Sequence, residues 1–96
     1  MAASAPDLLA HLPDAAAAAR RLADATLRAA RALLCPSGRP DATAMHLRQR
    51  ALHGCAWTAT TAEAVVRSTE AAQRLADAGR LGELDARLLT VGIAEY

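Results

Sequence analysis

The sequence predicts an all-α protein: a small antiparallel helical bundle with one long central helix and a short C-terminal helix. Apolar residues recur at intervals of three and four along most of the 96 residues, as they do on one face of an α-helix. β-branched residues cluster only at residues 58–66, and the strict alternation typical of a half-buried strand is absent there. Helices joined by short turns are therefore expected throughout a single domain, residues 1–96.

Residues 1–13 are predicted to form a short N-terminal segment. Ser4 can cap a short helix, in which Pro6 is tolerated in the first turn. Pro13 is expected to break or kink this helix, because proline removes one helical hydrogen bond and clashes with the preceding turn.

Residues 14–34 are predicted to form the first long helix, with an apolar face wide enough to contact two neighbours. Residues 35–40 contain two prolines and a glycine, which predicts a loop. Because this loop is short, the helices on either side should form an antiparallel hairpin.

Residues 41–77 carry the longest helical pattern, which predicts one helix about 50 Å long at 1.5 Å per residue. Asp41 or Thr43 can cap its first turn, and Gly79 follows its end. Gly54 in the middle of this helix costs roughly 1 kcal/mol relative to alanine, so we expect another backbone to come close to it.

Residues 81–96 are predicted to form a third helix with unusually wide apolar coverage. One stripe holds Leu81, Leu84, Leu88 and Val91, and a second holds Leu89, Ile93 and Tyr96. A terminal helix that is apolar on this scale is expected to continue or to be covered by another surface.

Composition predicts a thin core. Trp57 and Tyr96 are the two aromatic residues, and alanine is in large excess, so each helix contact removes little area from water at about 25 cal/mol per Å². We therefore expect a dimer or a complex with a partner. The candidate packing or interface residues are Gly54, Trp57, Val65, Leu88, Ile93 and Tyr96.

Charge and hydropathy argue against two classes of partner. All 11 basic residues are arginine, against 10 acids, and the arginines of the first long helix are interspersed with Asp14 and Asp24. A solvated helix face is favoured over nucleic-acid binding. No apolar run approaches the roughly 20 residues that span a membrane, and no secretory signal is evident, so a cytoplasmic protein with reduced cysteines is expected.

No group of residues predicts catalysis, cofactor binding or metal binding. His46 and His53 lie about 10 Å apart along the predicted helix, too far for one metal ion. Cys55 lies on a different face from His53 and is predicted to be a buried structural thiol. Trp57 is assigned to core or interface packing rather than to a ligand contact.

Two stretches carry a resemblance to a known family. They are His53-Gly54-Cys55-Ala56-Trp57-Thr58-Ala59-Thr60, and the Gly82-Glu83-Leu84-Asp85 segment followed by Val91-Gly92-Ile93-Ala94-Glu95-Tyr96. Over residues 50–96 the chain resembles the N-terminal helical extension of methylsuccinyl-CoA dehydrogenases, a branch of the acyl-CoA dehydrogenase flavoproteins. It departs at Thr61 and Ala62, where the family has a tyrosine and an aliphatic residue.

The resemblance implies a non-catalytic N-terminal region of an acyl-CoA dehydrogenase-like oxidoreductase, which serves packing or subunit assembly. Its partner would be a flavoprotein catalytic domain, and FAD is implied only for that domain, since no residue of the family's FAD site, acyl-CoA pocket or catalytic glutamate falls within residues 1–96. The alternative is a stand-alone helical interaction module without enzymatic activity that pairs with itself.

Overall fold

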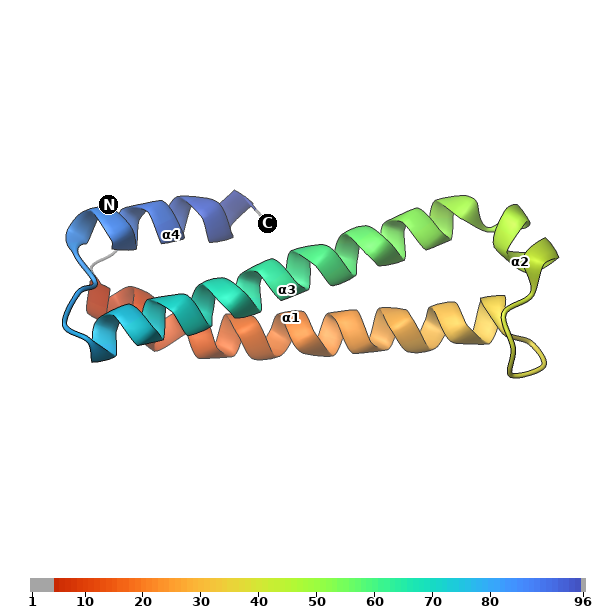
Figure 1. Cartoon of the computed structure of the whole chain (residues 1–96), viewed down its shortest axis with the longest axis horizontal. Coiled ribbons are helices and arrows are strands. Elements are labelled where there is room, and N and C mark those ends of the chain that lie inside the picture. Colours follow the sequence, from red (N-terminus) through yellow and green to blue (C-terminus); the bar gives the residue numbers. More distant parts are fainter. Residues whose placement is uncertain (1–4, 96) are drawn as a thin grey trace.

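The computed structural model describes residues 5–95, and over that range the chain is all-α, as predicted. Its four helices are α1 (Ala5–Leu34), α2 (Ala42–Leu47), α3 (Gln49–Asp77) and α4 (Glu83–Glu95). α1 and α3 form an antiparallel hairpin along the 51 Å long axis, and α4 folds back over one half of that hairpin (Figure 1).

α1 runs without a break through Pro13, so the predicted separation of residues 1–13 from the first long helix is wrong. Pro13 cannot donate to the carbonyl of Leu9, which costs about 3 kcal/mol. Leu8 and Leu12 lie within two turns of it and are only 8% and 2% exposed. Burying each leucine contributes about 1.5–3 kcal/mol, which offsets the proline. Ser4, the expected cap, lies outside the described residues.

The long helix predicted for residues 41–77 is wrong in one respect, because it is divided at Arg48 into α2 and α3. Asp41 caps α2, since its carboxylate accepts a hydrogen bond of 2.8 Å from the Ala44 N–H. The Asp41 N–H donates to the carbonyl of Leu34 at 2.8 Å. That bond ties the start of α2 to the end of α1. The chain changes direction at Arg48, which has φ −115° and ψ 28°, and α3 begins there (Figure 1).

The turn from α3 to α4 is a glycine-terminated helix end. Gly79 has a φ of 67°, its N–H donates to Ala76, and the Arg80 N–H donates to Leu75 at 2.7 Å. These two bonds define a Schellman motif, which satisfies the last carbonyls of α3. α4 then begins at Glu83, two residues later than predicted, and the Asp85 carboxylate accepts a bond from the Gly82 N–H.

The core lies at the end of the hairpin that α4 covers. Leu8 and Leu12 of α1, Ala72 of α3 and Ala86 of α4 form one buried cluster. Leu9, Leu89 and Ile93 are half-buried against it. Because two of the four buried residues are alanines, the three helices approach closely there while burying little apolar area.

Candidate interaction surface

A groove of about 320 Å³ opens beyond the C-terminal end of α4, between α1 and α3. We call this the Trp57 groove. It is lined by small and apolar side chains, with two threonines among them: Ala15, Ala19, Leu22, Trp57, Thr58, Thr61, Ala62, Val65 and Ile93.

The Trp57 groove continues the surface on which α4 rests. Ser68, Ala72 and Leu75 of α3 line a groove together with residues of α4, and they follow one another along α3 at spacings of four and three. The same spacing leads back along α3 to Val65 and Thr61, in the open groove. One helical seam is therefore covered by α4 over one half of the hairpin and uncovered over the other half (Figure 1).

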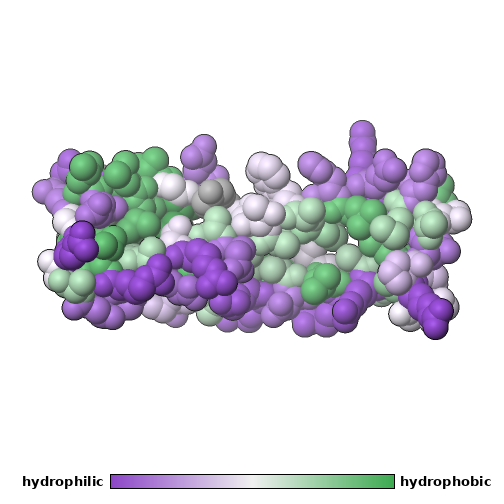
Figure 2. Space-filling model, viewed as in Figure 1, coloured by the Kyte–Doolittle hydropathy of each residue, from purple (hydrophilic) through white to green (hydrophobic). Residues whose placement is uncertain are grey.

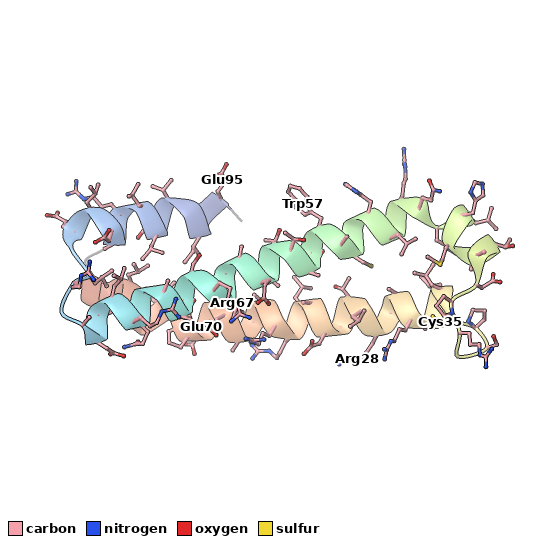
Figure 3. All side chains as sticks on the ribbon, in the orientation of Figure 1. Arg28, Cys35, Trp57, Arg67, Glu70 and Glu95 are labelled. Carbon is pink, nitrogen blue, oxygen red and sulfur yellow. The ribbon has the colours of Figure 1, made fainter. Side chains whose placement is uncertain are left out.

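Trp57 projects from α3 on the side where α4 lies, beyond the end of α4 near Glu95 (Figure 3). Its side chain is 67% exposed, although it has the largest apolar area in the sequence. Trp57 was predicted to pack either in the core or at an interface, and in the isolated chain it does not pack in the core. An interface role stays a prediction.

Among residues 5–95 no other backbone lies against Gly54, so the prediction of such a close approach is wrong for the fold that the structure describes. A β-carbon added there would meet nothing within 4 Å. Gly54 is instead exposed on α3, and its carbonyl accepts the Thr58 hydroxyl at 2.9 Å.

We expect Gly54→Ala to raise the free energy of unfolding by about 1 kcal/mol, because alanine restricts the unfolded chain and meets open space in the helix. Thermal melts followed by circular dichroism would measure the change. Gly92→Ala is a matched control, since that helical glycine is also surrounded by open space. A lower melting temperature for Gly54→Ala alone would mean that an associated chain needs the space.

The other candidate residues fall into three environments. Val65 is buried at 7% exposed and lines the Trp57 groove together with Ile93, which is half-buried. Leu88 is 62% exposed on α4. Tyr96 lies outside the described residues.

α4 carries a second uncovered apolar surface, which we call the outer stripe: Leu84, Leu88 and Val91, each between 62% and 69% exposed. The inner residues Ala86, Leu89 and Ile93 face the hairpin. At roughly 100° per residue the two sets lie about half a turn apart. Figure 2 shows apolar surface over the part of the molecule where α4 lies. The predicted wide apolar coverage of this helix is thus real, but among residues 5–95 one stripe is left largely exposed.

Sequence reasoning missed Leu22 as a candidate interface residue. It is 61% exposed and lines the Trp57 groove opposite Trp57. The signal was present in the sequence, since Leu22 follows Leu8, Leu12, Ala15 and Ala19 at alternating spacings of four and three. The spacing of these residues along α1 does not indicate which of them α4 covers and which it leaves exposed.

The charged groups lie on the solvent side of the helices. Arg67 bridges Glu63 and Glu70, with nitrogen to oxygen distances of 2.7 and 2.9 Å. The hydrogen bond to Glu70 and the two negative charges raise the pKa of Arg67, which stays protonated. All three side chains are exposed enough for solvent to screen these pairs, so they add little stability.

The histidines and cysteines are dispersed. His46 lies on α2 and His53 on α3, so the break at Arg48 removes the shared helix face expected for them. Cys35 and Cys55 are free and half-buried, which corrects the expectation that Cys55 is buried. Among residues 5–95, no three His, Cys, Asp or Glu side chains gather as a metal site would require. No helix in the same part of the chain has the length and apolarity to cross a membrane.

Comparisons of this chain with protein-family models, with curated proteins and with solved structures give no match. A functional assignment therefore depends on the geometry of the uncovered surfaces and on the residues that carry the family resemblance.

Proposed function

We propose that this chain is a non-catalytic helical packing module of an acyl-CoA dehydrogenase-like oxidoreductase, serving packing or subunit assembly. The observation that carries the packing role is Trp57, which is 67% exposed in a groove of small and apolar side chains. Tryptophan contributes more than most residues to protein interfaces when it fills a desolvated pocket on a partner. An exposed tryptophan in a groove that extends a helix-packing seam is suited to that use.

The groove chemistry supports contact with an apolar protein surface rather than with a flavin or an acyl-CoA. Sites for such ligands bring several polar groups together in a concave pocket. The polar side chains in the Trp57 groove are Thr58 and Thr61. The Thr58 hydroxyl already donates to the carbonyl of Gly54, so it is satisfied without a ligand. In this proposal FAD belongs to the flavoprotein domain.

The flavoprotein context is supported by where the resembling residues lie. Trp57 and Ile93 come from the two separate stretches that resemble the family, and both line the Trp57 groove. Thr61 and Ala62, where the family has bulkier side chains, line it as well. The smaller residues leave room for a partner side chain at the same place.

A second candidate function is a stand-alone module that pairs with itself, and the exposed area favours it. The chain exposes 6991 Å², whereas a compact monomer of 10.0 kDa exposes about 5,200 Å². In either case we propose a cytoplasmic setting, in keeping with the two free cysteines.

Flavin titration of the purified chain tests the non-catalytic part of the proposal. Flavin fluorescence should stay unchanged on addition of the chain up to micromolar concentrations. Saturable FAD binding in that range would overturn the assignment.

The flavoprotein context is tested on the coding DNA beyond the Tyr96 codon. An in-frame continuation of acyl-CoA dehydrogenase character is expected. In that longer protein, Trp57→Ala should weaken subunit assembly while FAD content is unchanged, and Trp57→Phe, which keeps an aromatic ring, should retain most of the assembly. A stop codon with no neighbouring flavoprotein gene would overturn this context and leave the self-pairing module.

A further inference from the structure

We infer that the Trp57 groove and the outer stripe of α4 are two halves of one interface, and that each groove receives the α4 of a second copy of this chain. The inference deepens the proposed packing function by naming the partner, and it does not depend on the flavoprotein context.

The first argument is surface area. The chain exposes roughly 1,800 Å² more than a compact monomer of its mass. Its radius of gyration is 17.2 Å, whereas about 12.5 Å is expected for a compact chain of this length. A standard interface removes about 800 Å² from each partner, and obligate dimers remove more. The excess is therefore large enough for a stable dimer.

The second argument is shape. α4 lies over one end of the hairpin and ends before the middle of its length, and beyond that point α3 rises toward the level of α4 (Figure 1). α4 has 13 residues and is about 20 Å long. Two such helices placed end to end span about 40 Å, which fits within the 51 Å length of the hairpin.

A two-fold axis perpendicular to the hairpin, near the end of α4, relates two copies in this way. The α4 of each copy then lies between its own hairpin and the open half of the partner's hairpin. A two-fold interface uses the same surfaces on both subunits. Here the Trp57 groove of each copy contacts the outer stripe of the other copy. The result is a middle layer of two α4 helices between two hairpins.

The third argument is the chemistry of the two surfaces. On α4, Leu84, Leu88 and Val91 are between 62% and 69% exposed. Leu88 also borders a groove that α4 forms with Ser68 and Ala72 of its own hairpin. The open groove offers small residues flanked by Leu22 and Trp57, which are 61% and 67% exposed. Large side chains of the outer stripe can pack between the small alanine and threonine side chains of the groove, as ridges of one helix pack into the grooves of another.

Formal charge agrees with this pairing. α4 carries three acids and one arginine, whereas the hairpin helices α1 and α3 together carry seven arginines and six acids. Docking α4 on the hairpin of a second copy therefore brings together opposite net charges, which favours encounter and orientation.

Sedimentation equilibrium of the purified chain tests the inference. As the protein concentration is raised from about 1 to about 200 μM, which brackets micromolar affinity, the measured mass should approach twice 10.0 kDa. Leu88→Glu on the stripe and Leu22→Glu in the groove should each weaken self-association at least tenfold. Leu27→Glu is the matched control, since Leu27 is 57% exposed on a different groove of α1 and should leave the dimer intact. Circular dichroism would verify that each variant stays helical.

A cysteine cross-link tests the geometry. In a chain with Cys35→Ser and Cys55→Ser, Glu95→Cys lies at the α4 end that the axis brings beside its symmetry mate (Figure 3). Oxidation should give a covalent dimer, whereas Gln73→Cys, exposed on α3, should give far less.

Three results would overturn the inference: a 10.0 kDa species over the whole concentration range, a dimer that Leu27→Glu disrupts and Leu88→Glu does not, or cross-linking through position 73 instead of 95. A monomer that binds no FAD would remove self-association and leave the non-catalytic packing role standing.

Discussion

Leu12→Ala is expected to lower the free energy of unfolding by about 3 kcal/mol, within the range of 2 to 5 kcal/mol measured for buried leucines. Leu12 is 2% exposed and belongs to the cluster where α1, α3 and α4 meet. The remaining members of that cluster are one leucine and two alanines, so no neighbour can fill the space left. Leu12 also lies beside Pro13, whose cost its burial offsets.

Thermal melts of wild type and variant at one protein concentration would measure this effect, since a loss of this size lowers the melting temperature of a 60–100-residue domain by roughly 12 °C or more. Leu27→Ala, at a 57% exposed leucine of the same helix, should change it by a few degrees at most. Equal effects of the two substitutions would mean that the first turns of α1 do not pack under α4.

Ala72→Leu is expected to cost 1 to 3 kcal/mol or more, because it adds three carbons where no space exists. Ala72 has no exposed surface and touches the residues of α1 and α4 in the core cluster. The strain is expected to fall on α4, since α4 shares much less contact with the hairpin than α1 and α3 share with each other (Figure 1).

Hydrogen exchange would locate the strain. The amides of α4 should exchange faster in Ala72→Leu, whereas those in the middle of the α1 and α3 pair should change little. Ala56→Leu is the control, because Ala56 lies on the same helix and is exposed. An unchanged melt and exchange pattern for Ala72→Leu would show that α4 does not rest on this residue.

The sequence alone did not distinguish which candidate residues are exposed and which are buried in the core. Trp57, Val65 and Ile93 line one groove. Their exposures differ widely, from 7% for Val65 to 67% for Trp57. Helical spacing assigns a residue to a face, but the exposure of that face depends on where a neighbouring helix ends.

The sequence by itself determined the all-α class, the hairpin and the positions of the turns, because these depend on local chemistry. The three-and-four spacing predicts helix, and the Pro36, Gly38 and Pro40 cluster and Gly79 fix the two turns. Asp41 was one of two caps expected there, with Thr43 as the alternative, and the structure shows that Asp41 is the cap.

Only the tertiary structure decided three further features. α1 passes through Pro13 because burial of Leu8 and Leu12 outweighs the lost hydrogen bond. The chain bends at Arg48, where φ is −115° and ψ is 28°, although the helical pattern of the sequence continues through that residue. Trp57 is left exposed because α4 ends before reaching it, and no local pattern encodes the distance over which one helix covers another.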